Sequence, residues 1–160
     1  MSTPVEIVAL QVSAVHAYEG RPADGPRTDP EPASRDHVVV RAGLGIVGDR
    51  YFNHPAHRNA AVTVFAVEAL DAGADPLLVR RNIVLRGFDV NGLVRHDVFT
   101  LDSGDGPVRF EVHRPANPCA WLDAVLGPGT MRALRGRGGM RCVPLDDGVL
   151  RRGPAVLSLG

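Results

Sequence analysis

The pattern of hydrophobic and polar positions along the chain predicts many short strands. Several runs alternate apolar and polar residues or consist of β-branched and aliphatic residues, which is typical of half-buried or fully buried strands. Gly, Pro, Asn and Asp residues between these runs indicate turns. The predicted strands cover residues 5–15, 37–41, 60–65, 81–87, 98–101, 108–113, 142–143 and 155–159.

Helical spacing of apolar residues is confined to short segments. The predicted helices cover residues 67–72, 118–126 and 130–134. Gly73 ends the first and Gly127 ends the second. The regular alternation of strand and helix that builds a doubly wound sheet is missing. We therefore expect a mainly β protein (β-rich α+β), with a closed or nearly closed β-barrel-like sheet and two or three short helices.

The chain length predicts one domain over residues 1–160, because 160 residues can bury one substantial core but are too few for two ordinary domains. Residues 20–36 contain most of the early prolines and almost no large apolar side chain. Too little chain precedes this segment to form a domain, so we interpret it as an exposed Pro-rich loop rather than a linker.

The overall charge balance argues against two classes of partner. The formal net charge is zero, so no overall field attracts the protein to nucleic acid or to anionic lipid. No apolar segment approaches membrane-spanning length, and no signal-peptide hydrophobic region precedes the first predicted strand. We expect a cytoplasmic protein that binds small molecules and binds neither nucleic acid nor membrane.

All 18 basic residues other than histidine are arginine, and lysine is absent. An anion site must therefore use guanidinium groups or backbone N–H groups. Arg81 and Asn82 at the start of a predicted strand are one candidate, with solvated side chains as the alternative. The Gly-rich residues 135–139 are a second candidate, as a backbone nest or simply a mobile basic loop. Asp49 and Arg50 either form a turn-stabilising ion pair or belong to the same site.

Cys119 is the main candidate for chemistry. The preceding Asn117 and Pro118 suit the N-cap and first position of a helix, which would place the thiol in the first helical turn. Free N–H groups and the positive helix dipole favour a thiolate there, and a thiolate is both a nucleophile and a soft metal ligand. The alternative is a buried cysteine that packs as a small hydrophobe, which is our interpretation of Cys142. Two such cysteines do not make a disulfide framework.

Two further patterns give weaker signals. Residues 43–48 match the glycine spacing of a dinucleotide-binding loop, but a proline-containing segment without helical periodicity follows, so we reject that interpretation. The glycines are expected to allow positive-φ turns or a close backbone approach. His54 and His57 have the spacing of a ligand pair, but no second pair accompanies them, and we expect solvated loop histidines.

Several motifs in order along the chain resemble the MOSC domains, relatives of the C-terminal domain of molybdenum cofactor sulfurase. Residues 45–51 (GIVGDRY) resemble the GI-x-GDR stretch of that family, and residues 81–87 (RNIVLRG) its R-N-I/L strand. Pro118-Cys119 falls where the family places its cysteine, followed by residues 136–139 and 147–148. The resemblance extends from about residue 5 to the end.

The resemblance implies a β-barrel-like fold that handles the molybdenum cofactor or sulfur bound for it. Cys119 would be a molybdenum ligand in cofactor-binding members, or would carry a persulfide in members that transfer sulfur. The remaining implied site residues would contact the pterin and its phosphate. They are Arg81, Asn82 and Arg50, with Arg137, Gly138 and Gly139 as weaker candidates for the same anion.

The leading functional hypothesis is a molybdenum-cofactor-binding enzyme of the MOSC type. It would reduce N-hydroxylated compounds with electrons from a partner reductase, or act as a sulfur carrier or sulfurtransferase through Cys119, supplied by a cysteine desulfurase. One alternative is a non-enzymatic carrier that passes the cofactor to another protein. The other is a degenerate β-barrel module that has lost the site and acts through protein contacts.

Overall fold

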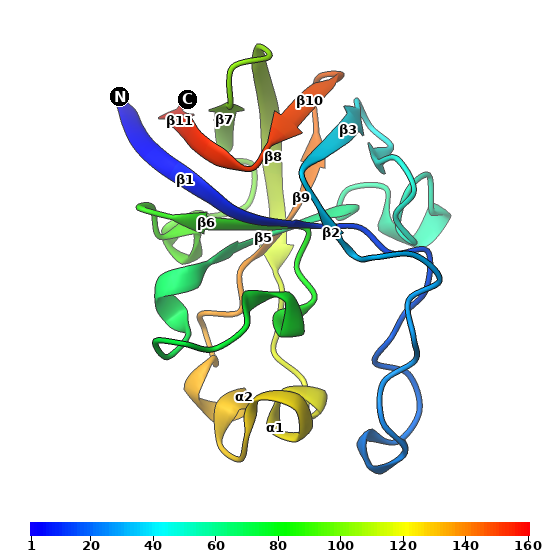
Figure 1. Cartoon of the computed structure of the whole chain (residues 1–160). Coiled ribbons are helices and arrows are strands. Elements are labelled where there is room, and N and C mark those ends of the chain that lie inside the picture. The colour runs from blue at the N-terminus through cyan, green and yellow to red at the C-terminus, as the bar shows by residue number, and fades with distance from the viewer.

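A computed structural model describes all 160 residues and consists mainly of β-strands, as Figure 1 shows. The strands are β1 (Ser2–Gln11), β2 (Ser34–Arg35), β3 (His37–Arg41), β4 (Gly45–Ile46), β5 (Val62–Ala66), β6 (Ile83–Arg86), β7 (Val98–Asp102), β8 (Pro107–Pro115), β9 (Met140–Pro144), β10 (Gly148–Arg151) and β11 (Gly153–Leu159). The α-helices are α1 (Trp121–Leu126) and α2 (Thr130–Ala133). Single 3-10 turns are η1 (Pro22–Asp24), η2 (Pro55–His57), η3 (Val67–Ala69), η4 (Pro76–Val79) and η5 (Val90–Gly92).

Seven strands close into a barrel, which confirms the expected fold class. Their order is β11-β7-β8-β9-β5-β6-β1, and β1 closes the ring by pairing antiparallel with β11. All neighbouring strands are antiparallel except β5 and β6, which are parallel and are joined by a crossover containing η3 and η4. The short β2 extends the sheet beyond β1, and β10, β3 and β4 form a separate small sheet.

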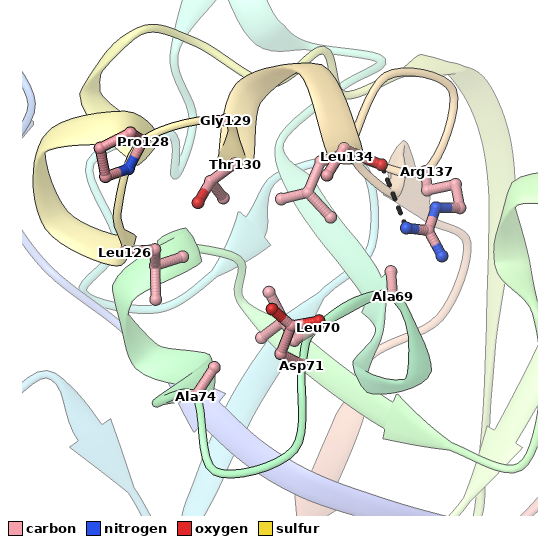
Figure 2. A pocket seen from close by; sticks show the side chains of 11 residues that line it. Ala69, Leu70, Asp71, Ala74, Leu126, Pro128, Gly129, Thr130, Leu134 and Arg137 are labelled. Carbon is pink, nitrogen blue, oxygen red and sulfur yellow. Dashed lines mark hydrogen bonds between the residues drawn. The ribbon is translucent and has the colours of Figure 1, made fainter.

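The two helices lie at one end of the barrel, and both chain termini lie at the other end (Figure 1). Leu122 of α1 and Leu134, which follows α2, are buried against Phe65 of β5. Figure 2 shows the hollow that remains between these helices and the segment around Leu70, with a volume of about 200 Å³. The longest helix has six residues, so no helix reaches membrane-spanning length.

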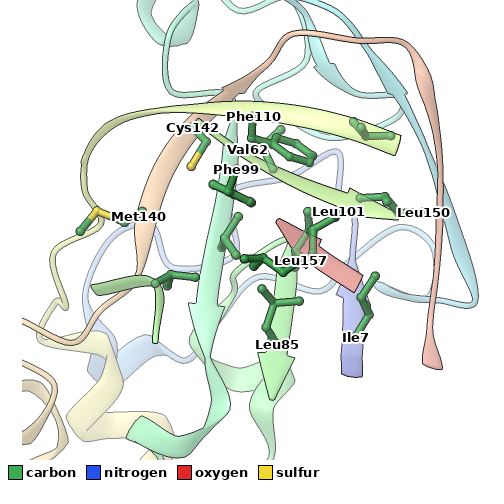
Figure 3. Packing of buried hydrophobic residues seen from close by; sticks show 14 of the residues in the cluster. Ile7, Val62, Leu85, Phe99, Leu101, Phe110, Met140, Cys142, Leu150 and Leu157 are labelled. Atoms are coloured by element: carbon green, nitrogen blue, oxygen red, sulfur yellow. The ribbon is translucent and has the colours of Figure 1, made fainter. Parts of the chain in front are cut away.

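The barrel interior is filled by apolar side chains that alternate along the strands. Phe99 of β7 and Phe110 of β8 are directly opposite in register and stack with their ring centroids 5.4 Å apart. Leu101 and Leu157 extend the same fully buried layer, as Figure 3 shows. Cys142 also lies in this core, and burial raises the pKa of its thiol to about 12, which confirms that it packs as a hydrophobe.

The helix expected over residues 118–126 begins later than its sequence suggests. It starts at Trp121 with Ala120 in the N-cap position, so Cys119 lies before the helix and the prediction for Asn117 and Pro118 is wrong. No backbone N–H bonds to the carbonyl of Asn117, which accepts from the Arg81 side chain, and the first backbone bond of this segment runs from the N–H of Leu122 to the carbonyl of Cys119.

Other boundaries differ by a few residues. The first strand ends at Gln11 rather than at residue 15, and the helix expected at 67–72 is the single 3-10 turn η3. The segment after Gly48 forms turns and no helix, so the rejection of a dinucleotide-binding loop is confirmed. Gly45 has φ 117°, and a Cβ there would lie 3.0 Å from that of Ala61, so this glycine allows a close backbone approach.

Candidate functional site

A cavity of about 240 Å³ opens where the loop after β1, the turn after β4, the start of β6, β9 and the segment before α1 meet. Its wall is rich in arginine and aromatic side chains. The lining residues are His16, Tyr18, Arg50, Tyr51, Thr63, Val79, Arg80, Arg81, Asn117, Cys119, Trp121, Leu122 and Arg141. Three of the residues predicted as site residues, Arg50, Arg81 and Cys119, therefore share one cavity.

Cys119 is an exposed free thiol in the wall of this cavity. It precedes the six-residue α1, so the helix N-terminus does not provide the environment that its sequence position suggested. The guanidinium of Arg81 is close enough to interact electrostatically with the sulfur, and a Cys119 thiolate would raise the pKa of Arg81. The thiol therefore has both solvent access and a nearby positive charge, which are the features of a reactive cysteine.

The side chain of Arg81 donates its hydrogen bonds to main-chain carbonyl groups. Its Nε donates to the carbonyl of Gly138 at 2.9 Å, and one terminal nitrogen donates to the carbonyls of Ala116 and Asn117 at 3.3 and 3.4 Å. Burial lowers the pKa of Arg81 to about 10, and no carboxylate pairs with it. Arg81 thus ties the start of β6 to the segment that carries Cys119, and its positive charge remains uncompensated within the protein.

Asn82 lies beneath the cavity and does not line it. Its Oδ1 accepts hydrogen bonds from the backbone N–H and the hydroxyl of Thr63 at 2.9 and 3.1 Å. Its Nδ2 donates to the carbonyl of Gln11 at 3.0 Å. The side chain therefore joins β5, β6 and the end of β1 under the floor of the cavity.

Tyr51 is flanked by two arginines that line the cavity with it. The guanidinium carbons of Arg50 and Arg141 lie 4.7 and 5.6 Å from the centroid of its ring. The Nε of Arg50 and one terminal nitrogen of Arg141 are buried and have no hydrogen-bond partner. A terminal nitrogen of Arg50 lies 3.4 Å from Oδ1 of Asp49, which is long for an ion pair. Burial raises the pKa of the Asp49 carboxyl despite this nearby arginine.

Arg80 connects the cavity to the long loop of residues 12–33. Its guanidinium donates to both oxygens of the Asp29 carboxylate, at 2.8 and 2.9 Å, and this contact is the main reason that the pKa of Asp29 is lowered. From the same loop, Tyr18 stacks on Trp121 with ring centroids 5.3 Å apart. The loop thereby supplies one wall of the cavity.

The Gly-rich segment has a different role from the nest expected for it. A Cβ on Gly138 would overlap the carbonyl oxygen of Ala116, so this glycine allows two main-chain segments to touch. The N–H of Gly139 donates to Oδ1 of Asn91 at 3.0 Å and is therefore engaged. Arg137 lies by the hollow near α2, where its side chain donates to the carbonyl of Ala133 (Figure 2). The structure does not bring these three predicted residues into the cavity wall.

Eight residues of the wall carry polar or aromatic groups and were not predicted from the sequence as site residues: His16, Tyr18, Tyr51, Thr63, Arg80, Asn117, Trp121 and Arg141. The alternation in β9 offered one signal, since Cys142 faces the core and the neighbouring Arg141 must face away from it. Nothing local indicates that this outer face meets the residues around Tyr51.

The comparisons with known proteins agree with this fold. The model of the MOSC domain family matches residues 54–156, and the chain therefore belongs to the MOSC domain family. No curated protein matches the chain at a significant level.

Similar solved structures include the YUAD protein from Bacillus subtilis, with a TM-score of 0.67 and 15% identity over 98% of this chain and 95% of that one. YiiM from Geobacillus stearothermophilus has a TM-score of 0.59 and 18% identity, covering 96% of this chain and 75% of that one. YiiM from Escherichia coli has a TM-score of 0.55 and 15% identity, covering 99% and 70%. At these identities the similarity establishes the fold.

Proposed function

We propose that this MOSC domain binds the molybdenum cofactor in the cavity and acts as an oxidoreductase, with the Cys119 thiolate as a ligand of the metal. The observation that carries this proposal is that the exposed Cys119 shares a cavity with Arg81 and Arg141, neither of which has a carboxylate partner. A soft thiolate beside uncompensated guanidinium groups suits a ligand that has both a metal and an anionic group.

The residues of the cavity fit the chemistry of this cofactor. Arg50 and Arg141 have buried N–H groups without partners, and guanidinium groups match phosphate well. We therefore assign the phosphate to these two residues, with Arg81 contributing charge and Asn82 supporting the floor. The volume of about 240 Å³ lies just below the usual range of about 300–1,000 Å³ for small-molecule pockets, so part of the ligand would remain at the mouth.

When bound, the cofactor supplies two-electron redox chemistry at its metal. The chain itself would hold Cys119 in place through Arg81 and the segment at Ala116, and Tyr18 and Trp121 would shield one side of the site. Burial and Arg50 lower the pKa of His16, which favours the neutral imidazole, a form that would accept a proton and pass it on.

The reaction that we propose is the reduction of an N-hydroxylated compound. The N–O bond breaks, two electrons come from a partner reductase, and two protons complete the amine and release the oxygen as water. His16 lines the same cavity as Cys119, and an imidazole there would relay the protons that this reaction needs.

A second candidate function is sulfur transfer, and the exposure of Cys119 favours it because a donor protein must reach the thiol. The Cys119 thiolate would attack the outer sulfur of a persulfide on a cysteine desulfurase. A new S–S bond would form on Cys119 while the donor S–S bond breaks and the donor thiolate leaves.

The test is the metal and pterin content of protein purified from a host that makes the molybdenum cofactor. We expect molybdenum and pterin near one per chain in the wild type, with molybdenum lost in Cys119→Ser. Cys142→Ala, which removes the core cysteine, is the matched control and should keep the metal. Absence of metal and pterin from all three proteins would exclude the cofactor proposal.

Two further measurements separate the alternatives. Bound pterin without reduction of any hydroxylamine, whichever reductase is supplied, would indicate a non-enzymatic carrier. Transfer of ³⁵S from labelled cysteine through a desulfurase to wild type but not to Cys119→Ser, released by a thiol reductant, would indicate a sulfur carrier. A protein that shows neither activity and no cofactor would be an interaction module.

A further inference from the structure

The positive charge of this net-neutral chain is segregated in the sequence. Residues 50–67, 112–122 and 131–145 contain arginine or histidine but no aspartate or glutamate. The barrel brings parts of these segments to one region, because β5, β8 and β9 are neighbours in the sheet. An arrangement of this kind gives a local field that the net charge conceals.

Contacts around Tyr51 define the centre of this region. Arg141 lies over the Tyr51 ring, and the ring of His57 lies 4.4 Å from that of Tyr51. His54 continues the cluster, with its ring 5.0 Å from His57. Arg114 of β8 is in direct register with Arg141 of β9, so two arginines face each other across adjacent strands.

The region continues along β8 towards the loop before β7. Burial lowers the pKa of His113, and the nearby Arg95, Arg114 and His96 lower it further. The nearby acidic groups are already engaged: Glu111 bonds to His96 at 2.9 Å, and Asp97 accepts from the N–H of Val94. We call the exposed or partly exposed residues of this region the basic face: His54, His57, Arg58, Arg95, His113 and Arg114.

The arginines of the basic face form no ion pair, although arginines elsewhere on the barrel do. Arg86 pairs with Glu6, Arg109 with Asp146, and Arg151 with Asp105. Like charges directly opposite on adjacent strands, as Arg114 and Arg141 are, destabilise a sheet. The arrangement therefore does not serve the stability of the isolated chain, and it leaves several positive charges for an external partner.

We propose that the basic face is the docking surface for an acidic face of a small redox protein that donates electrons. The identity of the partner as an electron donor rests on the proposed function. The basic face adjoins the cavity, because its residues His57 and Arg114 are next to Tyr51 and Arg141 of the cavity wall, so a protein bound there lies beside the site that electrons must reach. Val94, a residue that is 65% exposed and precedes Arg95, adds an apolar contact within the charged surface.

Charge complementarity supports a protein partner of this kind. Opposite charges steer diffusional encounter and orient the partner, and the effect weakens as salt is added. A transient electron donor requires fast association and fast release, which charged contacts supply better than a large apolar interface.

The test compares two variants with the same change in charge. Arg95→Glu/Arg114→Glu alters the basic face, whereas Arg132→Glu/Arg135→Glu alters two exposed, unpaired arginines of α2 and its following turn, outside the basic face. The probe is a fluorescein-labelled poly-glutamate peptide, followed by anisotropy at low ionic strength. We expect about tenfold weaker binding for the first variant and wild-type binding for the second.

A second readout locates the bound probe. Bound poly-glutamate should slow the alkylation of Cys119 by iodoacetamide in the wild type and in the Arg132→Glu/Arg135→Glu control, but not in Arg95→Glu/Arg114→Glu. Equal weakening in both variants, or no protection of Cys119, would overturn the proposal. Tighter binding of double-stranded DNA or of anionic lipid vesicles than of the peptide would also overturn it.

Measuring the molybdenum content of the same preparations tests the docking proposal separately from the proposed oxidoreductase function. Both variants should contain as much molybdenum and pterin as the wild type, because neither pair of residues lines the cavity. Peptide binding at the basic face without any cofactor in the wild type would contradict the proposed oxidoreductase and the electron-donor identity of the partner, while the basic face would stand as a docking surface for an acidic partner.

Discussion

The guanidinium of Arg80 donates two hydrogen bonds, of 2.8 and 2.9 Å, to the carboxylate of Asp29, although 50 residues separate the two in the sequence. Both side chains are largely buried, with 10% and 22% of their surfaces exposed. This contact holds the long loop of residues 12–33 against the start of β6. It explains how a Pro-rich segment without a core of its own can form a wall of the cavity.

We therefore predict that Asp29→Asn lowers the free energy of unfolding by about 2 kcal/mol, since a charged, partly buried hydrogen-bond pair is lost. Limited proteolysis should cut residues 12–33 faster in this variant. Glu19→Gln removes an exposed ion pair with Arg27 in the same loop and should change stability by less than about 1 kcal/mol. Equal effects of the two changes would contradict the role of Asp29.

The same contact has a defined pH dependence. The hydrogen bonds from Arg80 lower the pKa of Asp29 in the folded protein, so the unfolded chain takes up a proton first. The stabilisation is therefore complete above the unfolded pKa of about 4 and is lost as the pH falls through the folded value. Urea unfolding from pH 6 to pH 3 should show this loss in the wild type and a smaller one in Asp29→Asn.

Arg81 is predicted to act on Cys119 by positioning its segment. Arg81→Met leaves the carbonyls of Gly138, Ala116 and Asn117 without their donor and should cost about 2–3 kcal/mol of stability. It should also slow iodoacetamide alkylation of Cys119, because the nearby positive charge is lost.

Two further variants check this interpretation of Arg81. Arg137→Met removes one exposed hydrogen bond to the helical carbonyl of Ala133. It should change neither the stability of the protein nor the alkylation rate of Cys119. Arg81→Lys keeps the positive charge but cannot bond to all three carbonyls. It should therefore restore the alkylation rate of Cys119 more fully than it restores the free energy of unfolding. Unchanged stability in Arg81→Met would show that the carbonyls do not depend on this side chain.

Gly138 is predicted to tolerate no side chain. In Gly138→Ala the new Cβ would overlap the carbonyl oxygen of Ala116, so the segment before Cys119 must shift. We expect a loss of roughly 2–4 kcal/mol in thermal or urea unfolding, together with reduced molybdenum content. Gly136→Ala is the control: it has φ 76° but open space, so it should cost only about 1–2 kcal/mol of backbone strain.

The histidines near Tyr51 give a second pH prediction. Burial and Arg141 lower the pKa of His57, and burial and Arg50 lower that of His16, so the folded protein binds protons less readily than the unfolded chain. Stability should be complete above the unfolded pKa of about 6.5 and fall as the pH decreases through the folded values. His57→Gln should reduce this slope between pH 7 and pH 5, whereas His37→Gln, at an exposed position on β3, should not.

The barrel illustrates what periodicity alone can predict. The runs around Phe99 and Phe110 alternate so regularly that their inward faces follow from the sequence, and the structure confirms them as stacked core residues. The missing helix after Gly48 was equally predictable, because His54 and Pro55 follow without apolar periodicity. In each case a few consecutive residues determine the result.

The candidate site was predictable only in part. Cys119, Arg50 and Arg81 were identified by residue type and by resemblance, and they share the cavity. Arg141 was not among the predicted site residues, because an arginine in an alternating strand gives no sign of what its outer face meets. The predicted helix start at Pro118 was wrong: the carbonyl of Asn117 bonds to Arg81, far away in the sequence, and to no helical N–H group, and a local pattern does not reveal such a partner.

The sequence by itself determined the strands, the mainly β class, the absence of lysine that leaves arginine as the cation for any anion site, and the choice of Cys119 as the candidate reactive thiol. These features follow from local periodicity and from the chemistry of single side chains. Only the tertiary structure decided that Arg81 binds main-chain carbonyls, that Asn82 lies under the floor, and that Arg141 joins Tyr51. The physical reason is that hydrogen-bond partners and burial depend on segments brought together by barrel closure, and a local pattern contains no information about them.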